Sequence, residues 1–322
     1  MPHVGLAWQP AAIIAACVAV LAAVLIRTRR ARLVAAGRFA GEAALLFGLF
    51  ALWQYAGSFS LLPSSGGLPR ARWLWHAERL LHLPSEVSVQ RLFLPHPLLT
   101  EAFNLYYAVL HFPVLIGTLI WVFGWHRGHY RQVRTTVVLF TGASLLIQFI
   151  PVAPPRMLYG TGLVDTAARY GQSVYGSLGF DADQYSAMPS VHVGWALIVA
   201  IAVITACRGR WRWAALLYPA LTLLVVVVTA NHFWLDGAVA IVLVLGALGV
   251  QRAAGSLRVR WLTRPGHTAV PSSPGHTAAP SSPGHTAVPE PAGGPDAQSA
   301  PEPAGGPGAE GRAPDRAGST AC

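Results

Sequence analysis

Long apolar runs constrain this chain more than any other feature of its sequence. They lie near residues 9–26, 43–62, 102–123, 135–151, 190–207, 213–230 and 236–251. A helix needs roughly 17–25 apolar residues to cross a bilayer. Only 11% of the residues are charged and 53% are hydrophobic, whereas a soluble domain carries about 25% charged residues. The sequence therefore predicts an all-α, polytopic membrane helix bundle with about seven spans.

The arginines predict how the bundle is oriented. All 23 basic residues are arginine, and 17 of them fall on one side of the predicted spans. Cytoplasmic loops are enriched in basic residues. We therefore expect a plasma-membrane protein with its N-terminus outside the cell and its C-terminal tail in the cytoplasm. The arginines form no single stripe interleaved with aromatic residues, so a nucleic-acid partner is not predicted.

The composition divides the chain into three parts. Residues 1–42 hold the first span and an arginine-rich loop, residues 43–254 form the main membrane domain, and residues 255–322 form a tail. In the tail, Pro-Gly-His-Thr-Ala repeats from residues 265, 274 and 283. Such a segment buries too little apolar surface to offset the entropy of ordering. We expect it to be disordered.

One outer loop contains a short helical pattern. Within residues 63–100, apolar side chains recur at Trp73, Leu74, Ala77 and Leu80. This spacing predicts a helix that either lies in the membrane interface or packs on the bundle.

The string Pro189-Ser190-Val191-His192 opens the fifth apolar run. Proline is favoured in the first turn of a helix. The amides of Ser190 and His192 should then be free to bind an anion. An alternative is an ordinary helix start with an interfacial histidine.

The second string is His232 followed four residues later by Asp236. On a helix these positions share a face. A carboxylate there can orient the imidazole, leaving its other nitrogen free to attack. One alternative is a structural pair that closes a helix. Another is a metal site of two histidines and one carboxylate that also includes His192.

The third string is Ala153-Pro154-Pro155-Arg156, at the end of the fourth run. A guanidinium offers planar donors suited to phosphate oxygens, although an arginine here can also snorkel to lipid headgroups. The predicted topology places Arg156, His192 and His232 together on the outer face.

These strings resemble the three motifs of the type 2 phosphatidic acid phosphatase superfamily over roughly residues 40–250. Ala153-Pro154-Pro155-Arg156 and the string Asn104-x-x-Tyr107-x-x-x-His111 resemble its inositol-phosphorylceramide synthase (inositolphosphotransferase) branch, including bacterial members. The resemblance implies a six-helix core and an enzyme acting on a membrane lipid phosphate, as a hydrolase or a transferase.

The resemblance also implies a role for each residue. His232 would attack phosphorus to give a phosphohistidine, Asp236 would orient it, and His192 would protonate the leaving oxygen. Arg156 and Ser190 would bind the phosphoryl oxygens. No metal or other cofactor is implied. The polar residues of the third run are possible substrate contacts, although polar groups inside a bundle also bond helices together; they are Asn104, Tyr107 and His111.

The chain departs from the superfamily pattern at three positions. Phe149 stands where a lysine is usual, Met157 where a proline is usual, and Val226 where an arginine is common. These departures favour a thinner phosphate clamp. They also support an alternative, a catalytically impaired transporter or scaffold of the same fold. Nothing in the sequence predicts the oligomeric state.

Overall fold

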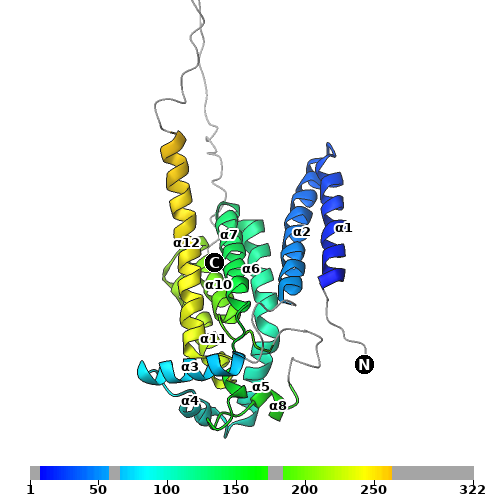
Figure 1. The fold of residues 1–322 in the computed structure, drawn as a ribbon. Coiled ribbons are helices and arrows are strands. Elements are labelled where there is room, and N and C mark those ends of the chain that lie inside the picture. Colours follow the sequence, from blue (N-terminus) through cyan, green and yellow to red (C-terminus); the bar gives the residue numbers. More distant parts are fainter. Residues whose placement is uncertain (1–7, 58–65, 173–183, 263–322) are drawn as a thin grey trace, which may run out of the picture. The chain divides into compact units, whose positions relative to one another are not determined.

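The computed structural model describes residues 8–57, 66–172 and 184–262, which are overwhelmingly helical (Figure 1). Within these ranges no strand forms, and the β-type pairing is a single parallel bridge between Val152 and Ser186. The predicted all-α fold is confirmed.

The long helices are α1 (Trp8–Ile26), α2 (Ala31–Gly57), α6 (His111–Trp125), α7 (Arg127–Gln148), α10 (Val191–Ala206), α11 (Leu217–Val228) and α12 (Trp234–Leu262). The shorter ones are α3 (Gly67–Leu80), α4 (Glu86–Phe93), α5 (Pro97–Leu105) and α8 (Thr166–Arg169). A π-helical turn joins α5 to α6, and a 3₁₀ turn precedes α11.

Among the residues that the structure describes, five helical segments are long and apolar enough to cross a membrane. They are Trp8–Ile26, Ala31–Leu52, Pro97–Trp125, Arg210–Val228 and Trp234–Leu257, and α10 is a shorter apolar helix. These segments confirm a polytopic membrane protein.

Two helices extend across the predicted boundaries. α2 begins at Ala31, so Arg32 and Arg38 lie on this helix rather than in a loop, and the expected division between residues 42 and 43 falls inside it. α12 continues to Leu262, so residues 255–262 are helical. The apolar window identifies the part of a helix that fits the bilayer core, whereas the helix itself extends into its polar flanks. The rest of the predicted tail, 263–322, lies outside the described residues.

A charged contact joins the α1–α2 pair to the rest of the bundle. On α7, Arg134 donates from Nη1 to both carboxylate oxygens of Glu42 on α2, at 2.6 and 2.8 Å. Tyr130 donates to the same carboxylate at 3.0 Å. Buried polar groups in a membrane protein pair with one another, and this pairing fixes α2 against α7.

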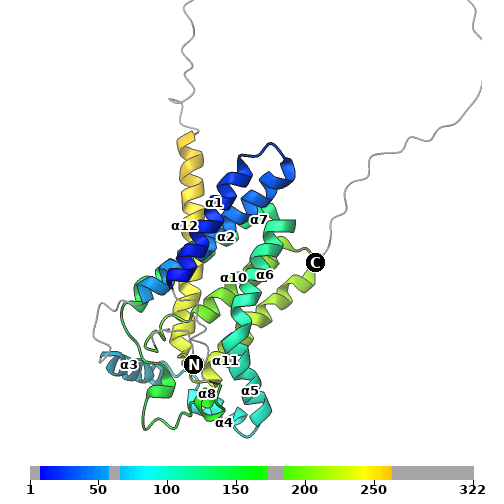
Figure 2. The same ribbon diagram turned by 90° about the vertical axis from the view of Figure 1, so that its right-hand side faces the viewer.

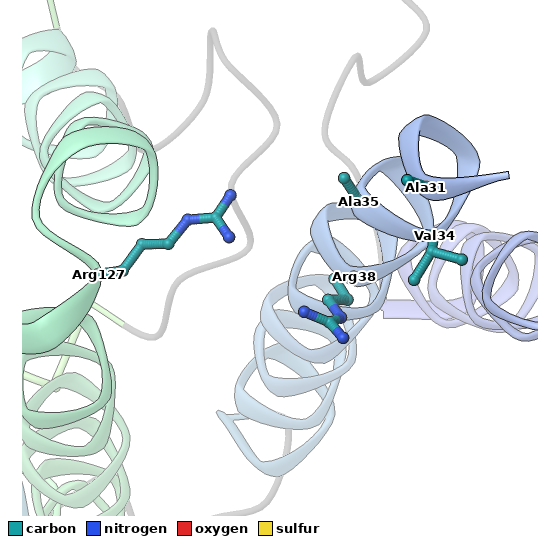
Figure 3. Close-up of a pocket in the computed structure, with 5 residues that line it drawn as sticks. All are labelled: Ala31, Val34, Ala35, Arg38 and Arg127. Carbon is teal, nitrogen blue, oxygen red and sulfur yellow. The ribbon is translucent and has the colours of Figure 1, made fainter. Parts of the chain in front are cut away.

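A small cationic cleft lies beside that contact. Ala31, Val34, Ala35 and Arg38 of α2 line one side, and Arg127 extends toward them from the start of α7 (Figure 3). The three sequence motifs follow or lie beyond the other end of α7. This cleft is therefore remote from the predicted site.

α10 packs closely against α7 at its own first turns. A Cβ added to Gly194 would lie 1.9 Å from Cζ of Phe140, whose side chain is fully buried. Only glycine allows this approach, and it fixes the helix start that carries His192.

The short helices α3, α4, α5 and α8 gather at the end of the bundle where α10 and α12 begin (Figures 1 and 2). The predicted outer-loop helix is confirmed as α3, with its apolar residues on two faces. Leu74 is buried against the bundle, whereas Trp73 and Leu80 are exposed.

Candidate active site

His232 lies in the turn between α11 and α12. At the end of α11, Ala230 donates to the carbonyl of Val227 and Asn231 to that of Val226, the hydrogen-bond pattern of a Schellman motif. Ala230 has a φ of 53°, a left-handed conformation that glycine usually supplies at this position. The reversal brings His232 out of α11 two residues before α12 begins. His232 and Asp236 therefore do not share a helix, contrary to the sequence prediction.

The ring of His232 is held through one nitrogen. Nδ1 lies 2.7 Å from the carbonyl oxygen of Ala187 and 3.5 Å from Oδ2 of Asp236. A carbonyl can only accept, so Nδ1 carries the hydrogen and Nε2 presents a lone pair. Nε2 is buried and has no hydrogen-bond partner among the described residues. This is the arrangement that a nucleophilic imidazole needs.

Asp236 is fully buried in the first turn of α12. Its Oδ2 accepts from the backbone N–H of Phe233 at 2.8 Å, as the third residue of a capping box does. Its main-chain carbonyl accepts from the N–H of Ser190 at 3.1 Å. One residue therefore caps its own helix, approaches His232 and ties the start of α12 to the start of α10.

The start of α10 differs in detail from the sequence prediction. Ser190, rather than Pro189, forms the boundary: it is the N-cap residue, and its Oγ accepts from Val193 at 3.5 Å. The N–H of Ser190 is taken by Asp236, so it is not one of the free amides that the sequence predicts. Hydrogen bonding between the two motifs uses that donor instead.

His192 faces His232 at a ring-centroid distance of 5.7 Å. Tyr107 stacks on His192 at 4.2 Å, and His111 meets the same ring edge-on at 4.8 Å. Nδ1 of His192 has no hydrogen-bond partner in the described part of the chain. The aromatic packing fixes the ring plane and leaves this nitrogen available for proton transfer.

Arg156 lies in a 3₁₀ turn (Pro155–Met157) after α7. Its N–H donates to the carbonyl of Ala230 at 3.0 Å, and its Nη1 donates to Oδ1 of Asn231. Its Nε lies 3.4 Å from Oδ2 of Asp165. The first motif is thereby fixed directly to the turn that carries His232.

The three polar residues of the third run do not act together. Tyr107 and His111 lie against His192; Tyr107 is part of a π-helical turn, Tyr106–Leu110, and His111 directly follows it. Such turns are frequent at functional sites. Asn104 instead accepts from Thr166 at 2.8 Å and donates to Gln172 at 3.0 Å. Its observed contacts hold the segment that contains Thr166 and Gln172.

The departures from the superfamily pattern are visible in the packing. Val226 is fully buried in α11, and its carbonyl accepts from both Asn231 and His232. Phe149 ends α7. Neither position brings a cation to the site, so Arg156 is the basic residue that the described contacts place beside His232.

Sequence reasoning missed three groups at this site. The carbonyl of Ala187 carries no side-chain signal. Asp165 is the N-cap residue of α8, and no spacing in the sequence pairs it with Arg156. Glu78, on α3, reaches the start of α12 through the N–H of Leu235. For Glu78, the sequence signal was an acidic residue beside the apolar positions of a predicted helix.

The metal alternative gains no support from the geometry. Across the ranges that the structure describes, no three His, Cys, Asp or Glu side chains are placed to hold one ion. Here His232 and Asp236 approach each other through Nδ1 and Oδ2.

Comparison with known proteins agrees with this constellation. Residues 72–250 match the family model described as the PAP2 superfamily, and the match includes Arg156, His192, His232 and Asp236. No curated protein and no solved structure matches the chain. Because the matched region spans more than half of the chain and holds the whole site, the chain belongs to the PAP2 superfamily of phosphatase-type membrane enzymes.

Proposed function

We propose that the protein moves or hydrolyses the phosphate of a membrane lipid through a phosphohistidine formed on His232. The observation that carries this proposal is the state of the His232 ring. Nδ1 is held by the carbonyl of Ala187 at 2.7 Å, and Nε2 is buried without a partner among the described residues. A purely structural histidine would be expected to use both nitrogens, because an unpaired buried polar atom is costly.

In the first step, Nε2 of His232 uses its lone pair to form a bond to phosphorus. The bond from phosphorus to the leaving lipid oxygen breaks, and that oxygen takes a proton from His192. Arg156 stabilises the charge that develops on the phosphoryl oxygens. Asp236, 3.5 Å from Nδ1, stabilises the positive charge that His232 acquires on bonding to phosphorus.

In the second step, the oxygen of water or of an acceptor alcohol bonds to phosphorus. Its proton passes to His192, the phosphorus–nitrogen bond breaks, and the electron pair returns to Nε2. Both histidines are then restored. Hydrolysis and transfer share this chemistry and differ only in the acceptor. The strings at 104–111 and 153–156 favour an inositolphosphotransferase-type enzyme.

The proposed substrate is a lipid phosphate because the site lies where apolar helices begin. α10 and α12, which carry or follow the two histidines, are both apolar, so acyl or prenyl chains can stay in the bilayer while the headgroup enters. We place the site on the extracytoplasmic face of the plasma membrane, opposite the arginine-rich ends of the helices.

The first prediction concerns the nucleophile. Purified protein should act on at least one of phosphatidate, a prenyl pyrophosphate and phosphatidylinositol, and His232→Ala should lower kcat by about 10³-fold or more, because it removes the attacking atom. Release of inorganic phosphate identifies a hydrolase, and a new phospholipid identifies a transferase. The matched control is His76→Ala, which alters an exposed histidine on α3. Full activity in His232→Ala would show that His232 is not the nucleophile, and a parent protein inert on all three lipids would leave the scaffold or transporter alternative.

The second prediction concerns the phosphate clamp. Arg156→Lys keeps the charge but loses the planar fork that contacts Asn231 and Asp165. Hydrogen bonds to charged groups contribute about 1.5–3 kcal/mol, so kcat/KM should fall roughly 10- to 100-fold. Arg72→Lys, at an exposed position on α3, is the control. Equal values for both variants would show that Arg156 does not bind the substrate.

The third prediction concerns the face of the membrane. Tyr159, near the site, is 89% exposed. Trp211, in the arginine-rich turn before α11, is 79% exposed. In intact cells, an impermeant thiol reagent should label Tyr159→Cys above the parent background and should label Trp211→Cys only after permeabilisation. The reverse pattern would place the site on the cytoplasmic face.

A further inference from the structure

Two carboxylates are fully buried behind the start of α12. Glu78 lies on α3 and Glu86 in the first turn of α4, and neither residue has any exposed surface. Arg79 pairs with Glu86, and its guanidinium also lies 4.5 Å from the ring centroid of Trp75. In this cluster, one arginine therefore accompanies two buried acids. Such an arrangement is costly unless one acid is neutral or otherwise used.

Glu78 is used by α12. Its Oε1 accepts from the N–H of Leu235 at 2.8 Å, and Leu235 immediately precedes Asp236. The first amides of a helix have no partner within the helix. Asp236 takes the N–H of Phe233, and Glu78 takes that of Leu235. The cap of α12 is thus completed from another helix.

A second contact strengthens the same junction. Nε1 of Trp234 donates to the carbonyl of Pro84, between α3 and α4, at 2.8 Å. The corner formed by α3 and α4 therefore holds two successive residues of the first turn of α12. Figures 1 and 2 draw α3 beside the start of that helix. Asp236 is the next residue, and its Oδ2 approaches His232.

We propose that Glu78 is a positioning residue that, as a neutral acid, holds the first turn of α12 and so places Asp236 against His232. It touches neither substrate nor nucleophile, and it acts through the helix start. The proposal rests on the function proposed above. It also gives the site an alkaline limit, because ionised Glu78 would stand beside the charges of Glu86 and Asp236.

The charges around Glu78 support a neutral state. The pKa of Glu78 is raised from 4.5 to about 9, chiefly by burial and also by its hydrogen bond to Glu86 and the charges of Glu86 and Asp236, while the Leu235 N–H lowers it. The facing groups are Arg79 on α3, Glu86 on α4 and Asp236 on α12. As the pKa is raised on folding, the folded state holds a proton that the unfolded state releases. The resulting stability is complete below pH 4.5 and is lost as the pH rises through about 9.

The experiment compares Glu78→Gln and Glu78→Ala with the parent chain between pH 6 and pH 10. Glutamine keeps an acceptor for Leu235 and a donor for Glu86 but cannot ionise. Glu78→Gln should retain kcat at neutral pH within about threefold and lose the fall of kcat near pH 9. Glu78→Ala should lower kcat roughly 10- to 100-fold with little change in KM, because it removes a hydrogen bond that orders the catalytic pair. Glu101→Gln, on α5, is the control and should keep the parent profile.

The outcomes separate this proposal from the function on which it rests. If parent activity does not require His232, the proposed function fails, and the melting temperature still tests Glu78: the parent should lose stability between pH 6 and pH 10 relative to Glu78→Gln. If activity requires His232, an unchanged alkaline limb in Glu78→Gln overturns the proposal, and so does parent-like kcat in folded Glu78→Ala. If Glu78→Ala does not fold, the pH profile of Glu78→Gln decides alone.

Discussion

The hydrogen bond between Nδ1 of His232 and the carbonyl of Ala187, at 2.7 Å, is the contact on which the rest of the site depends. It joins the chain before α12 to the chain before α10, and the bond from the Ser190 N–H to the Asp236 carbonyl joins them again. Backbone groups near a bilayer core have little water to bond with. Pairing these two helix starts satisfies such groups and, as a consequence, brings the imidazoles of His192 and His232 to a centroid distance of 5.7 Å.

The pairing also explains why Asp236 stands at 3.5 Å from Nδ1 rather than at ordinary hydrogen-bond distance. The Ala187 carbonyl already fixes the tautomer, and Asp236 is occupied as the cap of its own helix. Its contribution in this site is electrostatic, through a charge held close to the ring. Arg156 is oriented from the same turn, through Ala230 and Asn231. The nucleophile and the phosphate clamp therefore depend on one short segment of chain.

The sequence predicted which residues come together better than it predicted the local geometry. Arg156, His192, His232 and Asp236 stand out because ionisable residues beside a membrane span are costly unless they are paired or used, and the structure brings all four together. The helix ends were harder to place. Apolar windows do not mark where α2 begins, since Arg32 and Arg38 are compatible with a helix that leaves the membrane. Ser190, rather than Pro189, caps α10, and its N–H is bonded to the carbonyl of Asp236, which is remote in sequence. Contacts between segments remote in sequence, such as Leu235 with Glu78, leave no periodic signal.

The proposed mechanism requires a covalent bond between phosphorus and His232. The most direct measurement uses lipid substrate labelled in the transferred phosphate, quenched during the first turnover and analysed by peptide mapping. The account predicts an acid-labile, base-stable label on the peptide that contains His232. Once formed, that label should decay more slowly in His192→Ala, which lacks the base for the second step, and it should be absent in His232→Ala. Turnover without any phosphorylated protein, or a label that persists in His232→Ala, would contradict it.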